Sequence, residues 1–265
     1  MNLSSIFGVF AALAVVVVAI VTSSKSAQVF LDPHGILCVI GGTTAAGLMC
    51  FPLRFYTRIG GVLVNKFLGS YATRYETVIT ELTDLARGAR ENPDYLKQKV
   101  KSIRTPFLRD AVELIVQGGI SEDDLETILL KRASTHSKRY DYDVNVIRTI
   151  AKFPPAFGLM GTTLGMISLL QQLGGKDSQK MLGPAMAVGL VATFYGIVLA
   201  NLVLIPISEN LAMINREDET IRSIVIDGIR LVRDHEHPKL VEEHLKSYLL
   251  PNERAKLKKA AAAPA

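Results

Sequence analysis

Two threonines, Thr162 and Thr193, stand about halfway along two long apolar stretches of the sequence. Each lies on a helix face that otherwise carries small residues, namely Gly158, Gly161, Gly165, Ala185, Gly189, Gly196 and Ala200. Threonine oxygens can replace water around a passing cation, but a helical threonine also often bonds to the carbonyl four residues earlier. Small residues at such spacing are typical of close helix packing. The pattern therefore leaves two interpretations open, a cation path and simple packing.

The long apolar stretches have no acidic or basic side chain in their interiors. They span residues 3–21, 35–53, 153–173 and 182–207. Each is close to the ~20 residues that cross a ~30 Å hydrocarbon core, so we predict four transmembrane helices. A cation path through lipid normally contains a carboxylate. If this chain conducts cations, we therefore expect a second protein to supply the carboxylate.

Charged residues are concentrated outside these stretches, in residues 54–150 and 208–265. With 49% hydrophobic and 21% charged residues, the chain is too apolar to be disordered and too charged to lie wholly in a membrane. The net charge of +5 is accompanied by no nucleic-acid-binding motif, so we expect no nucleic acid partner. The predicted fold class is an all-α membrane protein with a helical cytoplasmic domain between the second and third spans and cytoplasmic helices at the C-terminus.

Basic residues flank the ends of the predicted spans. Arg54 and Arg58 follow the second span, Arg148 and Lys152 precede the third, and Arg216 follows the fourth. Lys and Arg near span ends are retained on the cytoplasmic side, so we expect both termini and the central segment to be cytoplasmic. The first span has no basic n-region and exceeds the usual apolar length of a signal peptide, which predicts an uncleaved anchor.

The predicted organisation divides the chain at the ends of the spans. We expect two spans in residues 1–53, a cytoplasmic helical domain in 54–150, two further spans in 151–207, C-terminal helices in 208–253 and a flexible tail in 254–265.

Helices are also predicted within the polar segments. Apolar spacing favours helices at 71–90 and 106–116, and Ser121, with Asp124 three residues later, predicts the cap of a helix through residue 130. A last helix is expected near residues 240–249. Before it, an amphipathic stripe is formed by Ile221, Ile224, Val225, Ile229 and Val232.

The sequence offers no pattern typical of a metal site or an enzyme. Cys38 and Cys50 both lie in the second span, about 18 Å apart along a helix, which is beyond the ~7 Å limit for a disulfide. The histidines have no acidic or Cys partner at ligand spacing, and no nucleophile elbow, P-loop or carboxylate pair is present. We therefore expect neither a cofactor nor an enzymatic activity.

Several motifs in order resemble one known family. They are FLDPHGILCVIGGT, PPAFGLMGTTLGMI, LGPAMAVGLVATFYGIVLANLVLIPI and IRSIVIDGIRLVRDHEHPKLVEEHLKSYL. These segments resemble the MotA/PomA proteins, the ion-channel subunits of the bacterial flagellar stator, over nearly the whole chain. The resemblance implies a multi-pass protein of the bacterial inner membrane, in which a ring of five subunits transports H+ or Na+ and needs no cofactor. It also implies two partners, a MotB-type single-span protein that supplies the missing aspartate and the rotor protein FliG.

The resemblance implies roles for residues of the last two spans. Pro155 and Pro206 match prolines that shape helix motion during ion passage, although a proline also produces a simple kink or helix end. Thr193 matches a threonine found in proton and sodium types alike. Thr162 matches a position that is hydroxylic in sodium types and alanine in at least some proton types. The resemblance therefore favours sodium slightly and leaves the ion open.

The rotor-facing match is less complete. Arg90 aligns with the family's rotor-contacting arginine, whose other interpretation is a solvated residue at a helix end. The family's acidic partner falls near Gln98, so the acidic half of the contact is in doubt unless Glu91 or Asp94 replaces it.

A related possibility is an ExbB/TolQ-like energiser, which also surrounds a carboxylate-bearing partner with small-residue helices. That class has three spans and an external N-terminus, so the four apolar stretches and the Gly-Gly-Thr motif that ends at Thr43 favour the stator family.

Overall fold

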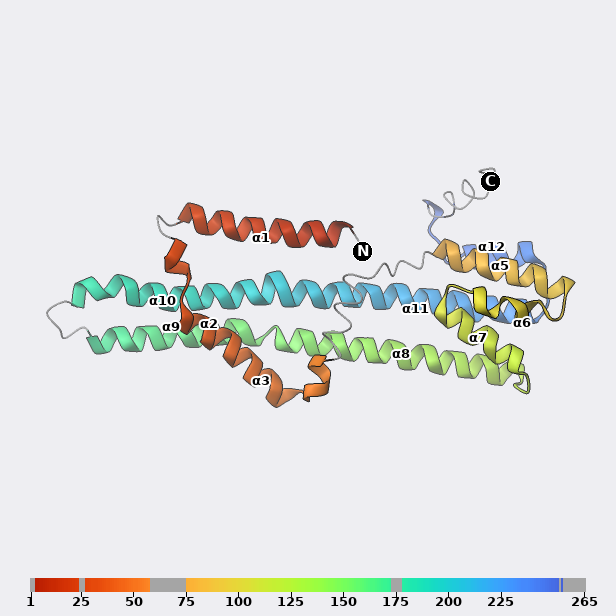
Figure 1. Ribbon diagram of the computed structural model, residues 1–265, viewed down its shortest axis with the longest axis horizontal. Helices are drawn as coiled ribbons and strands as arrows, with labels where there is room; N and C mark the ends of the chain where they lie inside the picture. The colour runs from red at the N-terminus through yellow and green to blue at the C-terminus, as the bar shows by residue number, and fades with distance from the viewer. Residues whose placement is uncertain (1–2, 24–26, 58–74, 173–177, 253, 255–265) are drawn as a thin grey trace. The chain divides into compact units, whose positions relative to one another are not determined.

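The computed structural model describes residues 3–23, 27–57, 75–172, 178–252 and 254, and this part of the chain is helical, without strands (Figure 1). The predicted all-α fold is confirmed. The chain forms two compact units, which we call the first unit (residues 1–71 and 141–212) and the second unit (72–140 and 213–265).

The first unit is built from the apolar helices. Its second span begins where Asp32 accepts hydrogen bonds from the backbone N–H groups of His34 (3.2 Å) and Gly35 (2.7 Å), with Pro33 in the first helical position. Its elements are α1 (Leu3–Ser23), the 3-10 turn η1 (Ala27–Phe30), α2 (Pro33–Ile36), the π-helical turn η2 (Leu37–Gly41), α3 (Gly42–Cys50), a helical turn at 53–57, α9 (Phe153–Gln172), α10 (Ser178–Val198) and the π-helical turn η4 (Leu199–Leu204).

Three helical stretches of the described chain contain segments long and apolar enough to cross a membrane. They are Pro33–Cys50, Glu122–Gln171 and Gly189–Arg233. In the first helix, Phe10–Ser23 is a shorter apolar stretch. The structure thus supports a membrane protein, and the count of four spans stays a prediction.

The second unit surrounds a core of large aliphatic side chains. Its elements are α5 (Tyr75–Glu91), α6 (Tyr95–Lys99), the 3-10 turn η3 (Val100–Ser102), α7 (Pro106–Gln117) and α12 (Pro238–Lys246). The long helices α8 (Glu122–Ile150) and α11 (Ile205–Arg233) contribute residues to both units. The largest fully buried side chains of this core are Ile79, Leu82, Leu108, Leu129, Ile224, Ile229 and Leu245. The predicted amphipathic stripe of α11 therefore faces the core.

The predicted helix start at Ser121 is confirmed. Its Oγ accepts a hydrogen bond from the Asp124 backbone N–H (3.2 Å) and donates one to the Asp124 carboxylate (2.5 Å). The predicted end at residue 130 was wrong, because α8 continues to Ile150. A polar run hides this continuation in the sequence, whereas Val144 and Ile147 extend the buried face. The helix α6 and the turn η3 were not predicted at all.

Candidate functional site

Thr162 of α9 and Thr193 of α10 face each other in the first unit. Their hydroxyl oxygens lie 2.5 Å apart. Thr162 Oγ1 lies 2.8 Å from the carbonyl oxygen of Gly189, and each threonine Oγ1 lies 3.2 Å from the carbonyl oxygen of Gly158. Four neutral oxygens therefore cluster between the two helices, and we call them the oxygen cluster. Oxygen atoms are the ligands that hard cations prefer, and they also suit a hydrogen-bonded packing contact.

Glycines bring the backbones of α9 and α10 close enough to form this cluster. A Cβ atom on Gly158 would lie 3.0 Å from the Ala192 carbonyl oxygen and 3.0 Å from Thr193 Cα. A Cβ atom on Gly189 would lie 3.1 Å from Thr162 Cα. Real Cβ atoms rarely approach so closely, so larger residues would separate the two threonines. The small-residue faces seen in the sequence therefore pack the two helices against each other and thereby position both hydroxyls.

The two prolines lie where helix geometry changes. Pro155 follows the break between α8 and α9, and its Cα would lie 3.1 Å from a Cβ atom on Gly196 of α10. Pro206 is exposed and is the second residue of α11, directly after the π-helical turn η4. A proline cannot donate to the carbonyl four residues earlier, and π-helical turns are frequent at functional sites. This placement fits a helix end as well as a helix-shaping role.

Tyr195 is a residue that the sequence interpretation missed. Its hydroxyl donates to the carbonyl of Phe30 and accepts from the backbone N–H of Asp32 (3.4 Å). The segment before the second span is thus anchored to α10, two residues from Thr193. The signal available in the sequence was a tyrosine inside an apolar stretch, because a buried tyrosine hydroxyl usually finds a hydrogen-bond partner.

A cavity of about 450 Å³ lies beside the oxygen cluster. Its lining is mostly apolar or small, namely His34, Gly35, Leu37, Cys38, Gly161, Leu164, Gly165, Ser168 and Ala192. Gly161 and Ala192 precede the two threonines in the sequence, but neither threonine lines the cavity.

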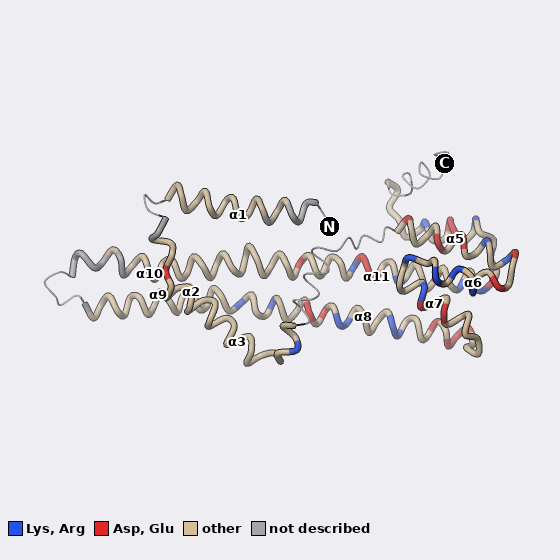
Figure 2. The backbone as a smooth tube through the Cα atoms, in the orientation of Figure 1, with Lys and Arg blue, Asp and Glu red and all other residues tan. Residues whose placement is uncertain are grey.

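Acidic and basic side chains are missing along α9 and along residues 183–198 of α10, as Figure 2 shows. Nor do three His, Cys, Asp or Glu side chains come together elsewhere in the described part of the chain. Within these helices, the ligand atoms for a cation are thus neutral oxygens.

Arg90 belongs to the second unit, where it is exposed in the last turn of α5. Asp84, on the same helix, accepts a hydrogen bond from the Tyr95 hydroxyl (3.0 Å) and lies 3.6 Å from Lys99 Nζ. Burial raises the pKa of the Tyr95 phenol, and its hydrogen bond to Asp84 raises that pKa further. Asp84 and Lys99 therefore interact within the unit, while the side chain of Arg90 extends into solvent. Gln98 is also exposed, and its amide side chain carries no charge.

Known proteins share this architecture along nearly its whole length. Residues 99–223 match the MotA/TolQ/ExbB proton channel family. The chemotaxis protein PomA of Vibrio alginolyticus is 31% identical over 259 residues, covering 96% of this chain and 98% of that protein. The chain belongs to the MotA/PomA family. Motility protein A of Borreliella burgdorferi is 27% identical to this chain, and the match covers 97% of each protein.

Two solved structures of MotAB share the fold. The flagellar MotAB stator complex of Bacillus subtilis matches with a TM-score of 0.85 at 22% identity, and C. jejuni MotAB matches with a TM-score of 0.84 at 19% identity. In each case the match covers 95% of this chain and 97% of the other. MotA/PomA membership therefore agrees with the helical architecture described above.

Proposed function

We propose that this chain is a stator subunit of the bacterial flagellar motor, which forms a cation channel with a MotB-type partner and converts ion flow into torque. The observation that carries the proposal is the 31% identity to PomA along 96% of the chain. The oxygen cluster and the uncharged helices around it fit this function, since they offer ligands to a cation but no countercharge.

The missing countercharge defines the partner. A cation inside a membrane normally needs a carboxylate, and the described parts of α9 and α10 have none. In our proposal, a single-span protein of the MotB type places an aspartate beside the oxygen cluster. Five copies of this chain, the number that the family resemblance implies, surround that partner in the inner membrane. Each copy spans the membrane four times, with α1 as the first span and both termini in the cytoplasm.

The transported ion is the only small species that the proposal requires. The hydroxyls of Thr162 and Thr193 can each offer an oxygen to sodium, whereas a proton can pass along water without such ligands. We therefore favour sodium over the proton.

The proposed rotor contact is electrostatic and centres on Arg90. Its exposed guanidinium at the end of α5 is available to an acidic surface of FliG. Because an exposed ion pair contributes only about 1 kcal/mol or less, several charges must share the contact. Glu91 and Asp94 are exposed nearby and can provide the acidic half that Gln98 does not.

The proposal is tested by ion flux in liposomes. The chain reconstituted with its single-span partner should conduct cations, whereas the chain alone, or the pair with the partner's membrane aspartate changed to asparagine, should not. Equal flux from the chain alone would overturn the proposal.

The rotor contact is tested by charge reversal. Arg90→Glu should reduce swimming while leaving membrane assembly intact, and an opposite reversal on FliG should restore part of the loss. Lys138→Glu, at an exposed position of α8, is the control and should swim normally. Full swimming after reversal of both Arg90 and Lys97 would contradict the contact.

A further inference from the structure

Two buried hydroxyl groups of the first unit have no hydrogen-bond partner among the described residues. They are Thr43 Oγ1 on α3 and the Tyr56 hydroxyl in the turn at residues 53–57. Thr43 is only 6% exposed. Buried polar groups are almost always hydrogen-bonded, to protein or to an ordered water, because an unpaired group destabilises the fold. Each of the two hydroxyls is therefore expected to bind an ordered water or another group.

The two hydroxyls approach the same face of α3. Thr43 and Gly47 are one helical turn apart, and the Tyr56 hydroxyl lies so close to Gly47 that a Cβ atom there would collide with it. Side chains four residues apart have Cβ atoms about 5–6 Å apart. One water molecule that bonds to both hydroxyls at about 2.8 Å each would span this distance.

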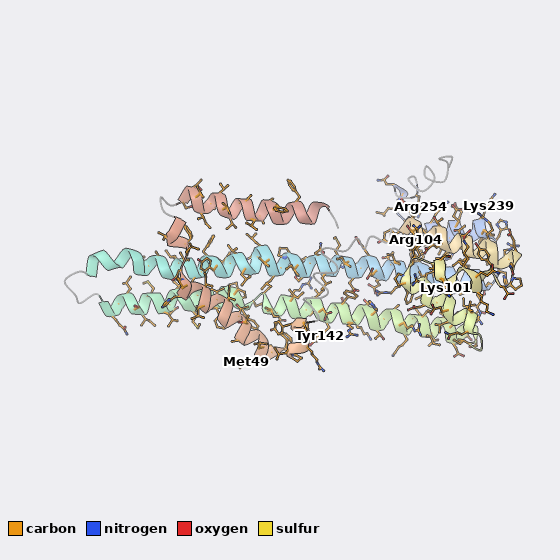
Figure 3. All side chains as sticks on the ribbon, viewed as in Figure 1. Met49, Lys101, Arg104, Tyr142, Lys239 and Arg254 are labelled. Atoms are coloured by element: carbon orange, nitrogen blue, oxygen red, sulfur yellow. The ribbon has the colours of Figure 1, made fainter. Side chains whose placement is uncertain are left out.

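Aromatic contacts hold Tyr56 in this position. Its neighbour Phe55 is buried and packs edge-on against Tyr142 of α8, with ring centroids 6.2 Å apart. Tyr142 is labelled in Figure 3 beside the chain that follows α3. Met49, near the end of α3, is instead 89% exposed. The Phe55 ring also packs edge-on against the Tyr56 ring, with centroids 5.8 Å apart, and the Tyr56 hydroxyl is buried.

Thr43 lies opposite the break between α8 and α9. A Cβ atom on Gly42 would collide with the Phe157 ring, and one on Gly47 would lie 3.9 Å from Ile150 Cγ1. Residue numbers therefore decrease from α9 to α8 as they increase along α3, and Thr43 lies between these two contacts, within the interval from Ile150 to Phe157. The break between α8 and α9, at residues 151–152, falls within the same interval.

The break supplies acceptors for the two hydroxyl donors. Pro154 and Pro155 have no N–H group, so the carbonyls of Ile150 and Ala151 have no backbone donor four residues later. Ala151 is only 5% exposed, which keeps its carbonyl away from bulk solvent. The break therefore leaves two carbonyl acceptors without a backbone donor, in the stretch of chain against which α3 packs.

We propose that Thr43, Tyr56 and the carbonyls of Ile150 and Ala151 bind a buried water at the α8–α9 break. A buried water typically makes two to four hydrogen bonds, and these groups supply that number. The water joins the second span to the start of the third through hydrogen bonds, at the proline pair that interrupts the helix. This site is separate from the oxygen cluster, and it does not depend on which ion or partner the chain uses.

Isosteric removal of the hydroxyls tests the site in the full chain, purified with its partner. Thr43→Val and Tyr56→Phe should each lower the thermal unfolding midpoint by a few degrees. The double variant should lose no more than the larger single effect, because both hydroxyls hold the same water. Thr44→Val is the matched control, since the exposed Thr44 hydroxyl already bonds to the carbonyls of Ile40 (2.7 Å) and Gly41 (2.9 Å); its midpoint should not change.

The direction in which the unfolding midpoint shifts distinguishes a bound water from hydroxyls that are buried without a ligand. If the two hydroxyls were simply buried without a ligand, replacing them by apolar isosteres would raise the midpoint. A raised midpoint, or losses that add in the double variant, would overturn the proposal.

A high-resolution map of the same complex gives the direct test. It should show an ordered water within hydrogen-bond distance of Thr43 Oγ1 and the Tyr56 hydroxyl. A dry contact, with the hydroxyls bonded directly to carbonyls, would overturn the site. Density that disappears when sodium is replaced by choline would instead identify a cation and overturn the assignment to water.

Discussion

The α9–α10 pair and the core of the second unit pack in opposite ways. Between α9 and α10 the closest approaches join backbone to backbone, as at Gly196, where a Cβ atom would collide with the carbonyl of Pro154. In the second unit, a Cβ atom on Gly228 would instead meet the end of the Leu82 side chain, 2.5 Å from Cδ1. One contact is tight because backbones touch, and the other is tight because a large side chain fills the space.

The difference agrees with what lipid and water would each favour. In water, burial of large apolar side chains drives folding, by roughly 25 cal/mol per Å² of apolar surface. Lipid is as apolar as leucine, so helices in a membrane associate through close packing and hydrogen bonds. The glycines and paired threonines of α9 and α10 are typical of packing in lipid. The buried Leu82 and Ile224 of the second unit are typical of packing in water. The comparison predicts that a substitution at a backbone contact has a larger effect than one at a side-chain contact. It also predicts that only the effect at the side-chain contact is relieved by a second substitution.

The largest effect is expected at Gly196. Gly196→Val would force the backbones of α9 and α10 apart, because the atoms it meets belong to the Pro154–Pro155 backbone and cannot rotate away. We expect loss of the assembled complex from the membrane, measured by co-purification with the partner. Gly183→Val in the same helix is the control, since nothing lies within 4 Å of its added Cβ. Normal assembly of the Gly196 variant would contradict the close-packing interpretation.

A smaller loss of stability is expected in the second unit, and a second substitution should relieve part of it. Leu82→Ala should cost about 2–5 kcal/mol of stability, because its side chain is fully buried. Gly228→Ala should destabilise by about 1–3 kcal/mol alone, but by less when Leu82 is already alanine and leaves room. Chemical denaturation of the four variants measures this coupling. Strictly additive costs would show that Leu82 does not set the space available at Gly228.

The smallest effect is expected at the start of α8. Ser121→Ala removes the hydroxyl that caps the Asp124 backbone N–H and should cost about 1 kcal/mol of stability. Ser134→Ala, at an exposed position within α8, is the control and should be neutral or slightly stabilising, since alanine favours helix. Both values come from the same denaturation experiment, and equal stability of the two variants would argue against the cap.

Local features could be predicted from the sequence, and contacts between distant segments could not. The cap at Ser121 and the buried face of Ile224 and Ile229 follow from spacing within a single helix, and both were predicted. The partnership of Thr162 with Thr193 follows from neither helix alone, because it depends on how α9 and α10 align. Each threonine was selected from the face it occupies, and only the structure brings the two together.

Other features depend on register between separate elements. The anchoring of Phe30 by Tyr195 and the approach of the Tyr56 hydroxyl to Gly47 involve residues whose own neighbours carry no signal for the contact. Asp84 likewise meets Tyr95 and Lys99 only because α6 folds back on α5, and α6 is too short for apolar periodicity to mark it. Long-range alignment of helices is therefore the part that the sequence pattern did not contain.

Rotation speed of the Thr162 variants tests most directly whether the oxygen cluster lies on the ion path. Cells carrying Thr162→Ala, Thr162→Ser or Thr163→Ala are compared over a range of sodium concentrations at a fixed proton gradient. Thr162→Ala should rotate much more slowly with normal assembly, Thr162→Ser should keep most of the speed, and Thr163→Ala should match the unsubstituted chain. The exposed hydroxyl of Thr163 bonds only within its own helix, to the carbonyl of Leu159 at 2.9 Å. Unchanged rotation by Thr162→Ala at every sodium concentration would show that the cluster is a packing contact.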